Sequence, residues 1–76
     1  MALNGLGRHE ETIEVFNQVL EINPKDARTM NEKGVILLNI SRNVEALETL
    51  NQTLKINPYY SKAKENKKIA ESKISE

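Results

Sequence analysis

The residues that this chain lacks exclude several kinds of site. Its 76 residues contain no cysteine, which excludes disulfides and thiolate metal sites. They contain one histidine, His9, and a single histidine cannot hold a zinc ion alone. A core of this size contributes only about 3–5 kcal/mol. We therefore expect stability to come from helix packing or from a partner chain.

The chain also lacks net charge and long apolar segments. It has 11 basic and 11 acidic residues, so its charges balance. A balanced chain has little electrostatic reason to bind nucleic acid or a membrane surface. No segment approaches the roughly 18 apolar residues that cross a bilayer, and the N-terminus lacks the pattern of a secretory signal. We expect a cytoplasmic protein with no nucleic-acid and no membrane partner.

Constellations of catalytic residues are absent as well. Acyl transfer needs a nucleophile, a base and an orienting group in one place, and nothing in the sequence pairs with His9 in that way. Gly5 and Gly7 lack the third glycine and the preceding strand of a phosphate-binding loop. The lysines near the C-terminus are interrupted by glutamates and carry no Trp or Phe among them, which favours a solvated surface. The expectation is no enzyme, no catalytic residue, no cofactor and no metal.

What the chain does contain is one segment that occurs twice. Residues 8–24 read RHEETIEVFNQVLEINP and residues 42–58 read RNVEALETLNQTLKINP, an offset of 34 residues. Nine of these 17 positions are identical, and several of the others exchange like for like. A period between about 20 and 50 residues indicates a modular array of repeated units.

Apolar residues at helical spacing predict four helices, over residues 8–22, 27–40, 44–56 and 61–76. Pro24 and Pro58 end two of them, because proline removes an N–H donor and restricts the residue before it. Residues 2–6 are expected to be the end of a further helix whose beginning is absent. No strand pattern is found, so we expect antiparallel helix pairs with short connections.

Individual residues predict how these helices begin and pack. Asp26 stands at an N-cap position, and residues 41–43 are expected to form a turn and a second cap. Gly34 lies in the middle of a helix, where glycine costs about 1 kcal/mol relative to alanine, so a close approach of another helix is expected. The last helix is predicted to bury one narrow edge: Ala63, Ile69, Ala70 and Ile74.

With these positions the sequence resembles the tetratricopeptide repeat (TPR) family, whose unit is a 34-residue helix–turn–helix. Gly34 and Ala46 match its small residues, Leu50 stands at its Phe or Tyr position, and Pro58 matches its closing proline. The departures from the pattern are Val19, Met30, Lys33, Leu37 and Thr53. The resemblance implies an all-α, TPR-like α-solenoid fragment of about four helices, the first truncated. Its single domain is expected to hold a partial repeat (1–24), a complete repeat (25–58) and a capping helix (59–76).

The resemblance also implies a non-catalytic interaction module or scaffold that binds a protein or peptide. In TPR proteins the first helix of each repeat lines a groove for an extended peptide or a helix. Carried over, the groove residues are Arg28, Asn31, Glu32, Val35, Leu38, Asn39, Lys62 and Asn66. The adjacent aromatics Tyr59 and Tyr60 either pack on the last helix or face a ligand.

An alternative function is self-association. Without a preceding helix, residues 8–22 have an uncovered side, and exposed apolar patches mark interfaces. The candidate residues are Leu3, Leu6, Ile13, Phe16 and Val19. We expect a homo-oligomer, most simply a two-fold dimer, formed by docking or by a helix swap through the turn at 41–43. A C-terminal fragment of a longer TPR array is the remaining alternative.

Overall fold

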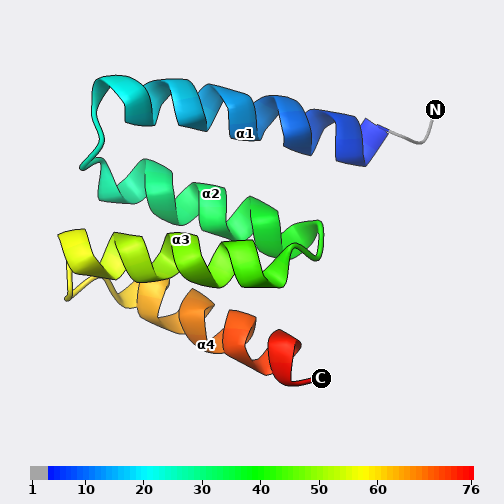
Figure 1. The fold of residues 1–76 in the computed structure, drawn as a ribbon, viewed down its shortest axis with the longest axis vertical. Helices are drawn as coiled ribbons and strands as arrows, with labels where there is room; N and C mark the ends of the chain where they lie inside the picture. Colours follow the sequence, from blue (N-terminus) through cyan, green and yellow to red (C-terminus); the bar gives the residue numbers. More distant parts are fainter. Residues whose placement is uncertain (1–3) are drawn as a thin grey trace.

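Four helices follow one another across the molecule, each antiparallel to the one before it (Figure 1). The computed structural model describes residues 4–76, with their side chains from Arg8 onward. The helices are α1 (Asn4–Ile22), α2 (Ala27–Asn39), α3 (Asn43–Ile56) and α4 (Ser61–Ser75). The molecule is flat, with extents of 40 × 35 × 16 Å. The predicted all-α architecture is confirmed, and the described residues include no strand.

The two proline turns are built alike, as the repeat predicts. The amide of Asp26 donates to the carbonyl of Asn23 at 3.1 Å, and the amide of Tyr60 donates to the carbonyl of Asn57 at 3.2 Å.

Asp26 is the N-cap of α2, and its carboxylate accepts from the amide of Thr29 at 3.2 Å and from its hydroxyl at 2.9 Å. These two hydrogen bonds from Thr29 hold the pKa of the Asp26 carboxyl below its usual value of 3.8. The bond from the amide has the larger effect and the bond from the hydroxyl the next largest. Tyr60, at the equivalent place before α4, makes no such side-chain cap.

The turn between α2 and α3 is a helix-ending motif with a left-handed residue. Ser41 has a φ of +63°. Its amide donates to the carbonyl of Leu38 at 3.0 Å, and the amide of Arg42 donates to that of Leu37 at 2.8 Å. This is the pair of hydrogen bonds of a Schellman motif, in which the left-handed position is usually glycine. The predicted turn is present, but Arg42, the N-cap residue of α3, makes no side-chain cap hydrogen bond.

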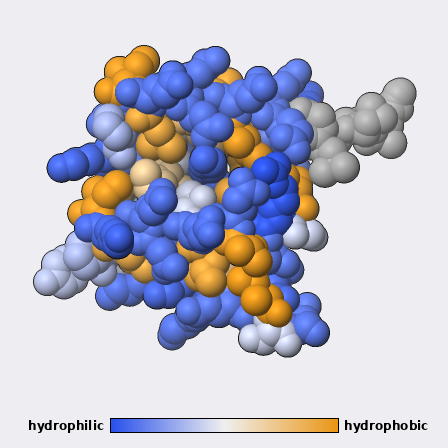
Figure 2. Space-filling view, viewed as in Figure 1, coloured by the Kyte–Doolittle hydropathy of each residue, from blue (hydrophilic) through white to orange (hydrophobic). Residues whose placement is uncertain are grey.

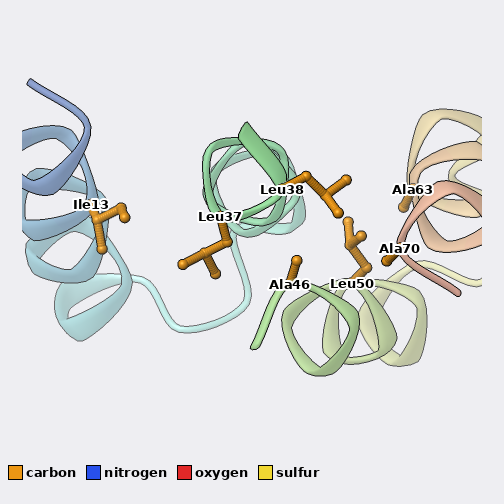
Figure 3. Packing of buried hydrophobic residues seen from close by; sticks show 7 residues of the cluster. All are labelled: Ile13, Leu37, Leu38, Ala46, Leu50, Ala63 and Ala70. Atoms are coloured by element: carbon orange, nitrogen blue, oxygen red, sulfur yellow. The ribbon is translucent and has the colours of Figure 1, made fainter. Parts of the chain in front are cut away.

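The core lies between α2, α3 and α4, and α1 adds to it at one edge. Figure 3 shows Leu50 of α3 pointing into the space between α2 and α4. The buried cluster comprises Ile13, Leu37, Leu38, Ala46, Leu50, Ala63 and Ala70. A Cβ on Gly34 would lie 2.8 Å from Cγ and Cδ2 of Leu50, so the predicted close approach of a second helix at Gly34 is confirmed.

Two expectations about the helices are wrong. Residues 4–6 are not a separate helix end, because α1 runs from Asn4 without a break, whereas residues 1–3 lie outside the described residues. Glycine weakens a helix but keeps its N–H donor, so Gly5 and Gly7 do not have to end one. In α4, Ala63 and Ala70 are fully buried, while Ile69 and Ile74 remain exposed at the surface.

α1 is attached to the rest of the molecule less extensively than the other helices. Within the described residues it packs beside α2 and not beside α3 or α4. Ile13 is buried against the core, and the carboxylate of Glu10 pairs with the guanidinium of Arg42 at 3.4 Å. Both partners of that pair are largely exposed, and ion pairs of this kind contribute about 0–1 kcal/mol.

Candidate groove and uncovered helix

Two neighbouring hollows lie along α2 and α4 and together form what we call the α2–α4 groove. The larger hollow has a volume of about 510 Å³ and the smaller about 390 Å³. Val35 and Asn66 line both, so the two hollows meet between these side chains. The residues of the larger hollow are Phe16, Arg28, Asn31, Glu32, Val35, Ile36, Tyr60, Lys62 and Asn66. The smaller hollow is lined by Val35, Leu38, Asn39, Ser41, Asn66, Ile69 and Lys73.

All eight groove residues carried over from the family line one of these two hollows. Six line the larger hollow: Arg28, Asn31, Glu32, Val35, Lys62 and Asn66. Leu38 and Asn39 line the smaller one. They meet because the residues of α2 recur along one helical face and because α4 packs beside α2 as well as α3.

Two carboxamides connect the walls of the groove at its centre. The side-chain amide of Asn66 on α4 donates to the side-chain oxygen of Asn31 on α2 at 3.2 Å. Asn31 is only 4 % exposed, whereas Asn66 is half-buried. Each carboxamide retains hydrogen-bonding capacity beyond this bond, because an asparagine carries two donors and an acceptor. The pair therefore places donors and acceptors beside the apolar surface of Val35.

The charges around the groove are unequal. The lining includes three cations, Arg28, Lys62 and Lys73, and one anion, Glu32. Glu32 is paired with Arg28 at 3.5 Å. The lining therefore has an excess of positive charge, which favours acidic groups on whatever occupies the groove.

Several residues that line the groove are not among the eight carried over from the family. Tyr60 is half-buried, packs against the core and also lines the larger hollow, whereas Tyr59 is exposed. Phe16 reaches the larger hollow from α1. The remaining residues missed from the sequence are Ile36, Ser41, Ile69 and Lys73. Asn66, Ile69 and Lys73 follow one another at steps of three and four residues along α4, and this spacing was a signal that would have found Ile69 and Lys73.

The candidate residues for self-association are distributed differently from the expectation. Ile13 is only 7 % exposed and belongs to the core, whereas Phe16 and Val19 are half-buried. Leu3 lies outside the described residues, as does the side chain of Leu6. The most exposed apolar side chains of α1 in its described part are Val15, at 54 %, and Ile22, at 87 %. Figure 2 shows hydrophobic surface at the C-terminal end of α1, at the upper left.

No metal-binding cluster of three or more His, Cys, Asp or Glu residues occurs in residues 4–76. His9 lies half-buried on α1, and its Nδ1 atom has no hydrogen-bond partner in the described structure. In the same part of the chain, no helix is long and apolar enough to cross a membrane.

Comparison with known proteins identifies the family. Two family models, both described as tetratricopeptide repeat, match the chain, one over residues 15–48 and the other over residues 1–26. Together they span residues 1–48, which is more than half of the chain. No curated protein and no solved structure matches it significantly. The 34-residue period, the helical hairpins and these matches agree, and the chain belongs to the tetratricopeptide repeat family, whose repeats generally serve as protein–protein interaction modules.

Proposed function

We propose that this protein is a non-catalytic interaction module that holds an extended peptide segment of a partner protein in the α2–α4 groove. The observation that carries the proposal is the meeting of the two hollows at Val35 and Asn66. α2 has 13 residues and is therefore about 20 Å long. At about 3.3 Å per residue, an extended segment of about six residues spans that length.

The lining supports a particular kind of peptide. Val35, Ile36 and Tyr60 supply apolar surface for one or two side chains of the segment. The half-buried carboxamide of Asn66, which Asn31 holds by a hydrogen bond, is available to the peptide backbone, which carries one donor and one acceptor per residue. Lys62 and Lys73 favour acidic residues beside these anchors. The proposed ligand is thus a short segment that combines apolar and acidic residues.

A library of random peptides of about 12 residues, selected against the immobilised full chain, tests this function. We expect the selected peptides to be enriched in acidic residues. Lys62→Glu, which reverses a charge at the rim, and Val35→Lys, which fills the junction of the hollows, should each weaken their binding at least about tenfold. Lys55→Glu, an exposed charge reversal on α3 outside both hollows, is the matched control and should leave binding unchanged.

Two results would contradict the groove as the binding site. One is that a folded chain enriches no peptide at all. The other is that the enriched peptides bind Lys62→Glu and Val35→Lys as tightly as they bind the unaltered chain. Circular dichroism of each variant separates lost binding from lost folding.

We infer a second candidate function, self-association through α1, from one specific observation. Val15 and Ile22 are large apolar side chains exposed on the same helix. The two residues are seven positions apart and therefore share one face of α1, and apolar side chains gathered on an exposed face can mark an interaction site. The same surface also suits a preceding helix of a longer array. The molecular mass of the species in solution distinguishes self-association from this alternative.

A further inference from the structure

Each hollow of the α2–α4 groove has one net positive charge in its described lining. The larger hollow is lined by two cations, Arg28 and Lys62, and one anion, Glu32. Among the described residues, Lys73 is the one charged residue that lines the smaller hollow. Glu32 pairs with Arg28 at 3.5 Å, and no ion pair of the described residues includes Lys62 or Lys73. These two exposed lysines can therefore act on a ligand.

The two lysines lie on one face of α4, and each belongs to a different hollow. Lys62 and Lys73 are 11 positions apart, which is close to three turns of an α-helix at about 3.6 residues per turn. Asn66 and Ile69 lie between them on the same face and also line the groove. At about 1.5 Å per residue, the backbones of the two lysines are about 17 Å apart. One helix thus holds two positive charges at a defined separation.

The junction between the two hollows offers apolar surface and no charge among its described residues. Val35 and Asn66 line both hollows, and both side chains are half-buried. A charged group placed at this junction would lose hydration without an opposite charge beside it. An apolar side chain would instead cover Val35 and leave water, which is favourable. The described lining is therefore ordered along the groove as positive, apolar and positive.

We propose that the groove selects a segment with two acidic side chains about five residues apart and an apolar side chain between them. Extended backbone advances about 3.3 Å per residue, so five residues span about 17 Å, the separation of the two lysines. Each carboxylate then lies beside one lysine, and the apolar side chain lies on Val35. This inference rests on the proposed function, because it specifies the ligand of the same groove. Two adjacent acidic residues would lie beside only one of the lysines.

Two peptides of equal composition test the spacing by isothermal titration calorimetry with the full chain. Each has about 12 residues, namely two aspartates, one leucine and otherwise serine and glycine, and both of its ends are blocked to remove terminal charges. In the spaced peptide the aspartates lie five positions apart and flank the leucine, whereas in the clustered peptide they are adjacent. An exposed ion pair changes affinity only a few-fold, so we expect the spaced peptide to bind about threefold more tightly at low ionic strength.

Charge reversal in the chain tests the role of the two lysines. Lys62→Glu and Lys73→Glu should each abolish the advantage of the spaced peptide over the clustered peptide. Lys68→Glu is the matched control, because Lys68 is an exposed lysine of the same helix that is not among the described residues lining either hollow. This control also reveals any effect of net charge alone, and it should preserve the advantage. Loss of the advantage in all three variants to the same extent overturns the inference.

The results also separate this inference from the proposed function. Equal binding of the two peptides, lost for both in Val35→Lys, overturns the spacing and leaves the groove as the binding site. A spaced peptide that binds only with an unblocked C-terminal carboxylate overturns the pair of acidic side chains and likewise leaves the groove. If neither peptide binds, enrichment of random peptides that lack the spacing overturns this inference alone. If the random library enriches no peptide either, the proposed function is overturned as well.

Discussion

Gly34 determines how closely α2 and α3 approach each other. Leu50 occupies the space that a Cβ on residue 34 would need, and it is fully buried, so it has no solvent into which to move. In an exposed helix the same glycine would only weaken the structure. Glycine at position 34 therefore makes α2 itself less stable but allows α2 and α3 to pack closely.

Replacing Gly34 by alanine tests whether close packing outweighs helix propensity at this position. Overpacking a core costs about 1–3 kcal/mol, and the gain in helix propensity returns about 1 kcal/mol. We expect Gly34→Ala to lower the free energy of unfolding by about 1 kcal/mol, measured by urea denaturation. Ser72→Ala, at an exposed position of α4, should raise it slightly because nothing crowds that position. A Gly34→Ala variant that is more stable than the unaltered chain would show that the contact with Leu50 relaxes without cost.

At the scale of a single element, the two ends of α2 are held in different ways. Asp26 satisfies the N-terminus with its side chain, whereas the C-terminus closes through backbone hydrogen bonds around Ser41. The left-handed conformation of Ser41 carries a cost, because a Cβ crowds the backbone there by roughly 1–2 kcal/mol. Serine at position 41 is therefore less favourable for the stability of the protein than glycine would be.

Ser41→Gly should consequently stabilise the protein. Glycine adopts the left-handed conformation without strain, and part of that gain is lost because glycine has more freedom in the unfolded chain. We expect the free energy of unfolding to rise by about 0.5 kcal/mol in thermal or urea unfolding. The same change inside a helix, Ser72→Gly, should lower it by a similar amount. Equal effects at both positions would argue against strain at Ser41.

At the scale of the whole molecule, α1 and α3 have closely similar sequences but different surroundings. α3 packs between α2 and α4, whereas α1 packs beside α2 alone in the described structure. Regions with few buried contacts open at lower free energy than the core. α1 should therefore be the first helix to open.

Amide hydrogen exchange measures this difference. At low micromolar concentration we expect the amides of residues 14–20 to exchange faster than those of residues 48–54, which are their repeat equivalents. Association through α1 should slow exchange at 14–20 as the concentration rises, while 48–54 change less. Equal protection of the two segments in the dilute monomer would contradict the unequal attachment of the two helices.

Much of the α2–α4 groove was predictable because its residues recur at helical spacing in a known register. The eight residues carried over from the family all line one of the hollows. For Tyr60 the sequence left open whether it packs on the last helix or faces a ligand, and Phe16 was assigned to self-association. Both line the larger hollow, because a turn and a helix outside the groove place them there. The uninterrupted course of α1 also escaped prediction, since glycine pairs occur in turns as well as in helices.

The sequence by itself determined the helical class, the 34-residue period and the ends of the helices at Pro24 and Pro58. These features depend on local backbone chemistry, which acts over a few residues. Only the tertiary structure decided which copy of the repeated segment is covered, where the hollows lie and that Ile13 belongs to the core while Val15 does not. Exposure depends on the neighbours that pack against a face: α3 packs between α2 and α4, whereas its repeat equivalent α1 packs beside α2 alone in the described structure.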